Sequence, residues 1–286
     1  MSESRFQPFH FSSDDGLKLY GRDYPCPSSS TPPVVCLPGL TRNSRDFHSL
    51  AAKLQSEGLR IITLDYRGRG QSEWDPNKAN YNIMREAQDV LAALDHLGIE
   101  KARFIGTSRG GLILHMLGNM APDRIISMIF NDIGPVIESD GLRHIRDYLS
   151  EKPPYPSLGA AIESLVSIHR AEFPALSDCD WQDMASAIYR QTELGWIVDF
   201  DPALAEPLKT IDFSQQLPDL WSQFELLKAI PLLVVRGEHS RLLSEKTVSE
   251  MLERHSKSFA AVALGQGHAP LLHLDSIYAA VSRFLK

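Results

Sequence analysis

The chain has 286 residues, enough for one large α/β domain with an insertion or for two ordinary domains. It is 43% hydrophobic and 23% charged, and no apolar run approaches the roughly 20 residues that span a bilayer, so a globular chain that neither spans a membrane nor is disordered is expected. A net charge of -7 without a basic cluster argues against a nucleic-acid partner and favours a small molecule.

The first part of the chain predicts a hairpin and then the start of an alternation between strands and helices. Apolar residues on both sides of an Asp-Gly turn predict a β-hairpin over residues 9–20. A continuous apolar run at 34–37, typical of a strand buried on both faces, ends at a Pro-Gly pair. Helical spacing follows at 44–57, and a second buried-strand pattern occupies 59–64.

The middle of the chain continues this alternation. Apolar side chains on one side predict a helix over 82–97. A short apolar run at 104–105 precedes the sequence Gly-Thr-Ser-Arg-Gly at 106–110, and the apolar-rich residues 112–120 predict the next helix. Another buried strand is expected at 125–130.

The alternation breaks after the strand at 125–130. Residues 136–225 contain helical patches, many prolines and no convincing buried strand. We therefore expect residues 1–135 and 226–286 to form one α/β core, with 136–225 inserted after its sixth strand as a mainly helical cap.

The end of the chain resumes the alternation, with a strand at 231–237, a helix at 245–253, a strand at 259–264 and a closing helix at 276–285. The last strand leads into Gly-Gln-Gly-His at 265–268. Repeated alternation of this kind predicts a mostly parallel sheet flanked by helices.

The most informative pattern surrounds Ser108. Strand, sharp turn, serine and helix is the geometry that exposes a nucleophilic hydroxyl, and glycines at 106 and 110 leave room for the strained turn. On its own, Gly-x-Ser-x-Gly also describes ordinary turns. The position between a predicted strand and a predicted helix, with a histidine motif downstream, favours the nucleophile.

Four motifs, each at the end of a predicted strand, occur in the order found in the α/β-hydrolase superfamily. They are Leu-Pro-Gly-Leu at 37–40, Asp-Tyr-Arg-Gly-Arg-Gly-Gln-Ser at 65–72, Gly-Thr-Ser-Arg-Gly at 106–110 and Gly-Gln-Gly-His at 265–268. The chain resembles that superfamily over nearly its whole length, and least in the insertion. The resemblance implies the α/β-hydrolase fold, with ligands bound at the carboxyl ends of the strands.

The resemblance also implies the roles of several residues. Ser108 is the expected nucleophile and His268 the base that accepts its proton, since His268 lies in a glycine-rich loop and follows the serine in the chain. The backbone N–H groups of Leu40 and Arg109 are the expected oxyanion hole.

The acid of the triad is where the sequence departs from the family pattern. Most of the superfamily places an aspartate after the seventh strand of the sheet, but the corresponding loop, 237–241, has none, and Ser240 and Arg241 occupy the likely positions. Asp132 and Glu238 are the two candidates to orient His268. We favour Asp132, which directly follows a strand, although its sequence context also suits an ordinary turn.

Arg109 and the aromatic residues of the insertion are the candidate pocket residues. Arg109 either binds a substrate carboxylate or pairs with Glu238 and closes the site, and the structural pairing is favoured. The aromatic candidates for an apolar pocket above Ser108 are Trp181, Trp196 and Trp221, with Tyr148, Phe173 and Tyr189. Only some can face a cavity, and their abundance favours a substrate with an apolar or aromatic portion.

The function expected is hydrolysis of small carboxylic esters or lactones through an acyl-enzyme, without a metal or an organic cofactor. Carbon–carbon bond hydrolysis and enol-lactone opening remain alternatives on the same triad. A ligand sensor with slow or absent hydrolysis is the alternative of another class, because the usual aspartate is missing. Residues 1–5 lack the features of a secretory signal, so a cytoplasmic location is expected.

Overall fold

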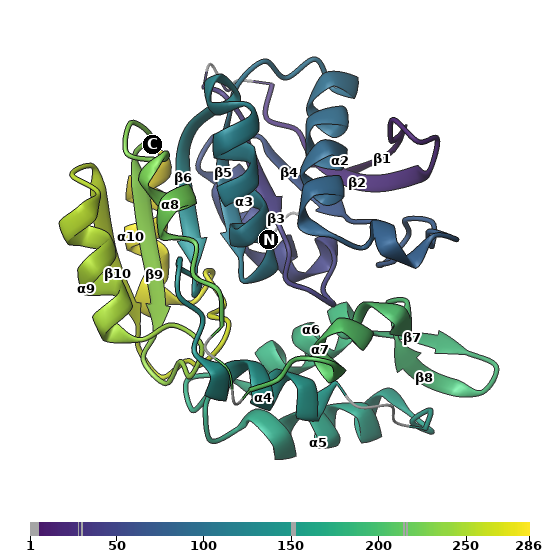
Figure 1. Cartoon of the computed structure of the whole chain (residues 1–286). Coiled ribbons are helices and arrows are strands. Elements are labelled where there is room, and N and C mark those ends of the chain that lie inside the picture. The colour runs from purple at the N-terminus through teal and green to yellow at the C-terminus, as the bar shows by residue number, and fades with distance from the viewer. Residues whose placement is uncertain (1–5, 28, 30, 150–152, 214, 216) are drawn as a thin grey trace.

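An eight-stranded sheet forms the centre of the molecule in the computed structural model, with the strand order β1-β2-β4-β3-β5-β6-β9-β10 (Figure 1). β1 pairs antiparallel with β2 and β2 with β4, while the other neighbouring strands are parallel. The strands are β1 (Gln7–Ser12), β2 (Lys18–Tyr24), β3 (Val34–Leu37), β4 (Ile61–Asp65), β5 (Ala102–Thr107), β6 (Ile125–Asn131), β9 (Leu232–Gly237) and β10 (Ser258–Ala263). The predicted mostly parallel sheet is confirmed.

The structure describes residues 6–27, 29, 31–149, 153–213, 215 and 217–286. The segment 1–5, on which the expected cytoplasmic location rests, lies outside the described residues. Within the described ranges, no helix combines the length and the apolar character needed to cross a membrane.

Helices cover both faces of the sheet, and each face has its own apolar core. One face packs against α2 (Ile83–His96), α3 (Arg109–Met120) and α9 (Glu245–Arg254). The other packs against α1 (His48–Ser56) and α10 (Asp275–Leu285). Successive residues of β3 alternate between the two cores, which explains why this strand is apolar throughout.

Four short 3-10 turns occur in the described residues, the first three in the core and the last in the inserted segment. They are η1 (Ser44–Phe47), which forms the first turn of the helix predicted at 44–57, and η2 (Lys78–Asn80), η3 (Pro122–Arg124) and η4 (Pro202–Leu204). The start of α2 is fixed by its cap, since the side chain of Asn82 accepts a hydrogen bond from the N–H of Arg85.

The inserted segment lies at one end of the sheet, where Figure 1 shows its helices and a small hairpin together. Its elements are α4 (Ser139–Tyr148), α5 (Leu158–His169), α6 (Asp178–Ile188), β7 (Tyr189–Thr192), β8 (Gly195–Val198), α7 (Glu206–Lys209) and α8 (Trp221–Glu225). Of these elements, α8 packs against α3 of the core, and the rings of Phe224 and His115 are in contact.

Two details of the strands differ from the sequence prediction. The hairpin β7–β8 was not expected, because its strands are short and only partly buried, and β7 carries polar residues in place of an apolar run. β10 was expected to be buried, but it is the edge of the sheet. Its side chains Phe259 and Val262 are 61% and 48% exposed, and β10 is the last strand in the order of the sheet.

His115, which lies in α3 behind Ser108, should make the fold sensitive to acid. Burial lowers the pKa of its imidazole to about 4, from 6.5 in the unfolded chain. Between these values the unfolded chain binds the proton and the folded chain does not, so stability falls as the pH falls. As the pH falls through this range, this single group should lower the free energy of unfolding by roughly 3 kcal/mol.

The expected result is that His115→Gln loses less stability than the native chain between pH 7.5 and pH 4.5, measured by urea unfolding. The glutamine can still donate to the Gly111 carbonyl, which the imidazole Nδ1 contacts at 2.9 Å. Equal losses in the two proteins would contradict the assignment. His10→Gln is the matched control, because His10 is an exposed residue of β1.

Candidate active site

Ser108 lies at the sharp turn between β5 and α3, in a backbone conformation that non-glycine residues rarely adopt. Its φ is 52°, in the left-handed range. The turn is also too crowded for other side chains nearby. A Cβ added to Gly106 would lie 2.6 Å from the carbonyl carbon of Gly110, and one added to Gly110 would lie 2.2 Å from the carbonyl oxygen of Leu37. The two glycines therefore permit the turn that presents Ser108.

The structure brings Ser108, His268 and Asp132 into one hydrogen-bonded chain. His268 Nε2 lies 2.9 Å from Ser108 Oγ, and His268 Nδ1 lies 2.8 Å from Asp132 Oδ2. Asp132 is fully buried. A carboxylate only accepts, so the proton of the neutral imidazole is assigned to Nδ1, which leaves Nε2 to accept from the serine hydroxyl.

Asp132 is held by two further donors from the loop after β9. The Gly237 N–H donates to Oδ1 at 2.8 Å, and the Ser240 hydroxyl donates to Oδ2 at 2.6 Å. Ser240 Oγ itself accepts from the N–H groups of Leu242 and Leu243, which directs its proton toward Asp132. Ser240 thus lies in the loop where most of the superfamily has its acid, and its hydroxyl binds Asp132, which directly follows β6.

Glu238, the other candidate acid, is not brought to His268. Its carboxylate accepts from the Gly265 N–H at 2.7 Å and lies 3.8 Å from the ring of His239. The side chain is 46% exposed. The Glu238 side chain, which is longer than that of an aspartate, therefore binds at the surface to the loop that leads to His268.

The segments that carry the expected oxyanion donors meet at Ser108. A Cβ added to Gly39 would lie 3.9 Å from Ser108 Cβ, and Leu40 lines the same cavity as the serine. The N–H of Arg109 begins α3, so it has no partner within the helix, and the helix dipole adds positive potential there.

The side chain of Arg109 contradicts both interpretations made from the sequence. Its Nε donates to Glu86 Oε2 at 2.6 Å and its Nη2 to the Tyr81 carbonyl at 3.2 Å, so its partner is not Glu238. It also does not line the cavity above Ser108. A glutamate on the amphipathic helix α2 gave no sign of being buried, which is why this partner was missed.

Glu86 links the two segments that carry the expected oxyanion donors. Besides Arg109, it accepts from Arg69 Nη1 at 2.7 Å, and Arg69 Nε donates to the Leu40 carbonyl at 2.8 Å. Glu86 and Arg69 are both fully buried. Burial alone would raise the pKa of Glu86, but the charges of the two arginines outweigh it and the pKa lies below its usual value. Glu86 is therefore an ionised anchor between Leu40 and Arg109.

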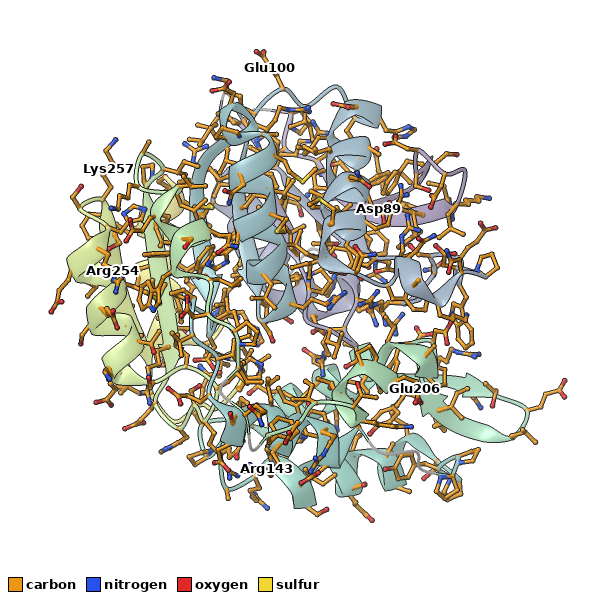
Figure 2. The ribbon with its side chains drawn as sticks, in the orientation of Figure 1. Asp89, Glu100, Arg143, Glu206, Arg254 and Lys257 are labelled. Atoms are coloured by element: carbon orange, nitrogen blue, oxygen red, sulfur yellow. The ribbon has the colours of Figure 1, made fainter. Side chains whose placement is uncertain are left out.

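A cavity of about 210 Å³ lies over Ser108, between the core and the inserted segment. Four of the six aromatic candidates line it: Tyr148, Phe173, Tyr189 and Trp196. Trp181 does not, because it is 2% exposed and packs inside the inserted segment against Phe173. Trp221 does not either, because its ring packs against Arg254, the last residue of α9, which Figure 2 labels. The guanidinium carbon of Arg254 lies 4.2 Å from the centre of the Trp221 ring.

The remaining lining is mainly apolar, with few charges. Arg42 lines the cavity, but its guanidinium forms two hydrogen bonds with Asp46, at 2.6 and 2.7 Å. Its charge is therefore already compensated, and the cavity favours neutral, apolar groups.

A mostly parallel sheet with a serine elbow after β5 and a histidine loop after β10 defines a class of protein, and the comparison with known families agrees. The model of the α/β-hydrolase fold family matches residues 32–273, so the chain belongs to that family. The fold and the family membership expected from the sequence are confirmed.

Proteins with esterase and hydrolase names are among the relatives that are similar to this chain. The 3-hydroxybutyrate-oligomer hydrolase of Cupriavidus necator is 31% identical over 249 residues, covering 83% of this chain and 82% of that protein. Esterase YbfF of Escherichia coli is 30% identical over 266 residues, covering 88% and 92%. An α/β-hydrolase structure from Novosphingobium aromaticivorans superposes with a TM-score of 0.90 at 35% identity, covering 100% and 99%.

Proposed function

We propose that this chain is a serine hydrolase that cleaves small carboxylic esters or lactones through an acyl-enzyme on Ser108. The observation that carries the proposal is the hydrogen-bonded chain from Asp132 through His268 to Ser108, at the base of a mainly apolar cavity. The relatives named as an esterase and as a 3-hydroxybutyrate-oligomer hydrolase support an ester as substrate.

In the acylation step, Ser108 Oγ attacks the carbonyl carbon while His268 Nε2 takes the hydroxyl proton. Asp132 keeps the imidazole in the tautomer with Nδ1 protonated and stabilises the imidazolium. The N–H groups of Leu40 and Arg109 receive the oxyanion. Collapse of the tetrahedral intermediate transfers the proton from Nε2 to the leaving alcohol and leaves the acyl group on Ser108.

In the deacylation step, the same histidine takes a proton from water, which attacks the acyl carbonyl. The second tetrahedral intermediate collapses to the free carboxylic acid, and the proton returns to Ser108 Oγ. No step requires a group beyond these side chains, the two backbone donors and water.

The proposed substrate follows from the lining of the cavity. Tyr148, Phe173 and Trp196 offer apolar surface, and the charge of Arg42 is occupied by Asp46. We therefore expect neutral esters or lactones with a compact apolar or aromatic portion to react faster than substrates that carry a carboxylate. The aligned hydroxyl, imidazole and carboxylate favour catalysis over a purely sensing role.

The test is labelling with a fluorophosphonate probe, which reacts with activated serines. We expect one label per chain, located at Ser108 by peptide mass spectrometry, and its complete loss in Ser108→Ala. Ser167→Ala, on an exposed part of α5, is the matched control and should be labelled like the native chain. A folded native chain that stays unlabelled would overturn the proposal in favour of a ligand sensor.

The reaction class is then determined with a panel of short p-nitrophenyl esters, aryl esters, lactones and dienone acids. Turnover of the neutral esters or lactones is the expected result. Turnover of the dienone acids alone would replace the ester proposal with carbon–carbon bond hydrolysis on the same residues.

A further inference from the structure

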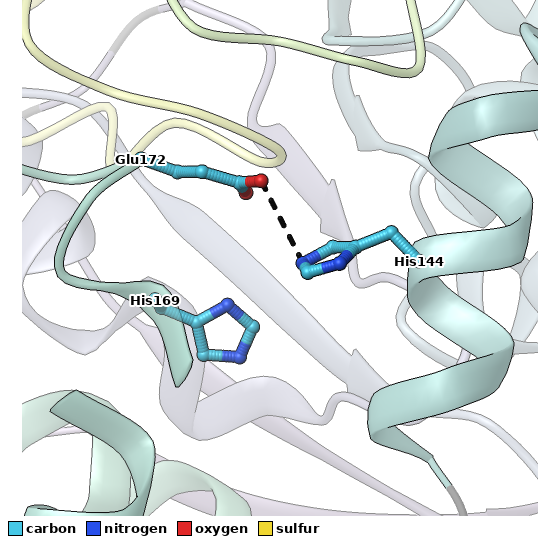
Figure 3. Close-up of side chains that lie close together, drawn as sticks. All are labelled: His144, His169 and Glu172. Atoms are coloured by element: carbon cyan, nitrogen blue, oxygen red, sulfur yellow. Dashed lines mark ion pairs between the residues drawn. The ribbon is translucent and has the colours of Figure 1, made fainter. Parts of the chain in front are cut away.

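Three side chains that commonly bind metals gather in the inserted segment, outside the proposed triad. His144 comes from α4, His169 is the last residue of α5 and Glu172 lies in the loop that follows, as Figure 3 shows. One nitrogen or carboxylate oxygen from each lies within 4.8 Å of the others. His144 Nε2 is 3.7 Å from Glu172 Oε1.

His144 is evidence for a bound ligand, because one of its ring nitrogens lacks a hydrogen-bond partner within the described residues. Its Nε2 atom is buried and has no hydrogen-bond partner there. Leaving such an atom unsatisfied costs free energy, whereas a metal ion would satisfy it. The ring is held in place by aromatic neighbours, since Tyr148 and His169 both meet it edge to face.

The donor set suits a transition metal better than Mg²⁺ or Ca²⁺. Two imidazoles and one carboxylate form a known zinc set with a fourth position left for water. Ligands at zinc distances in a tetrahedron are about 3.4 Å apart, so small side-chain rotations would close the present cluster around an ion. Mg²⁺ and Ca²⁺ prefer oxygen ligands throughout.

A nearby arginine sets the charge of the cluster. Arg241 Nη1 lies 3.6 Å from Glu172 Oε1, and this cation opposes a metal ion. Arg241 lies closer to Asp140, with its Nη2 atom 2.6 Å from the Asp140 carboxylate, which offsets the charge of the arginine. Asp140 can therefore retain Arg241 when Glu172 binds a metal ion.

The cluster also contacts the loop of His268 and the substrate cavity. A Cβ added to Gly267 would lie 2.9 Å from Glu172 Cβ, so this glutamate packs against the residue before His268. His169 lines the cavity over Ser108. An ion at the cluster would thus tie α4 and the end of α5 to the loop that carries the proposed base.

We propose that His144, His169 and Glu172 bind one divalent transition-metal ion, with Zn²⁺ as its best-suited occupant, and that the bound ion slows turnover by tying α4 to the His268 loop. The site itself is independent of the function proposed above, whereas its effect on turnover rests on that function.

Equilibrium dialysis of the full chain against micromolar ZnCl₂ tests the site without reference to activity. We expect one Zn²⁺ per chain, no competition from excess Mg²⁺, and binding weakened at least about tenfold in both His144→Gln and Glu172→Gln. His10→Gln is the matched control, and circular dichroism confirms that each variant is folded. A native chain that binds no Zn²⁺, or folded variants that bind it as tightly, would overturn the site.

Ester hydrolysis with and without ZnCl₂ then tests the coupling. Turnover of the native chain is expected to fall at least about threefold at saturating Zn²⁺, and that of His144→Gln to remain unchanged at the same concentration. Saturation of the site with no change in turnover would overturn the coupling. Equal inhibition of the two proteins would place the inhibitory ion elsewhere, and would overturn it as well.

Discussion

Replacing Asp132 by asparagine is expected to lower kcat about 10,000-fold while leaving KM nearly unchanged. The carboxylate accepts from three donors, His268 Nδ1, Ser240 Oγ and the Gly237 N–H, whereas an amide has only one oxygen. If that oxygen stays on Gly237, the NH₂ group faces His268 and favours the tautomer with Nε2 protonated, which cannot accept the proton of Ser108. The measurement is kcat on a p-nitrophenyl ester, with circular dichroism as a check on folding.

Glu238→Gln is the matched control, because this side chain is exposed and accepts a hydrogen bond from the Gly265 N–H. It should retain most of the native kcat. The assignment of the acid fails if Glu238→Gln loses turnover by orders of magnitude and Asp132→Asn does not.

Ser240 allows a sharper form of the same experiment. Its hydroxyl lies 2.6 Å from the carboxylate oxygen that His268 contacts, so a carboxylate introduced at this position can approach the imidazole. Adding Ser240→Asp to Asp132→Asn should therefore recover at least about tenfold of the lost kcat, because the restored charge stabilises the imidazolium. Failure to recover in a folded double variant would show that the backbone of this loop cannot present an acid.

Glu86→Gln is expected to destabilise the fold by about 3–5 kcal/mol, the usual cost of breaking a buried ion pair by removing one partner. It leaves the buried Arg69 and the nearly buried Arg109 without their shared anion. Since Arg69 also holds the Leu40 carbonyl, and Arg109 begins α3, both segments that carry the proposed oxyanion donors should loosen together. Urea unfolding measures the stability, and the folded fraction should show a lowered kcat with little change in KM.

The control for Glu86 is a surface pair of the same chemistry. Glu206 and Lys209 meet at 2.7 Å on α7, with side chains 58% and 47% exposed. Glu206→Gln should change the free energy of unfolding by less than about 1 kcal/mol. If Glu86→Gln were as mild as this control, Glu86 would not be the anchor that the contacts indicate.

Most of the sheet could be predicted because its central strands are buried on both faces. β3 and β4 carry unbroken apolar runs for that reason, and both were located to within two residues. The signal fails where strands are partly exposed. The polar strand β7 left no apolar run to detect, and the apolar residues of β10 suggested burial although the strand forms an edge.

The site was predictable only where the backbone dictated the sequence. Gly106 and Gly110 mark the elbow because larger residues would collide there, and they pointed directly to Ser108. The link from Glu86 to Arg109 left no such mark, since its partners are distant in the sequence and any helix carries acidic residues. For the same reason, the sequence could not tell that Trp196 faces the cavity while Trp181 packs behind it.

Ser108 and Asp132 share a backbone conformation that is costly for residues other than glycine. They are the non-glycine residues with positive φ in the described part of the chain, at 52° and 56°. Such conformations cost of order 1–3 kcal/mol each, and glycine would adopt them more readily. Selection for thermal stability alone would therefore favour glycine at position 108 and remove the proposed nucleophile. At position 132, glycine would instead leave the three donors to the Asp132 carboxylate without their acceptor. Stability and activity are opposed at Ser108, so efforts to make this protein more heat-resistant should leave this residue unchanged.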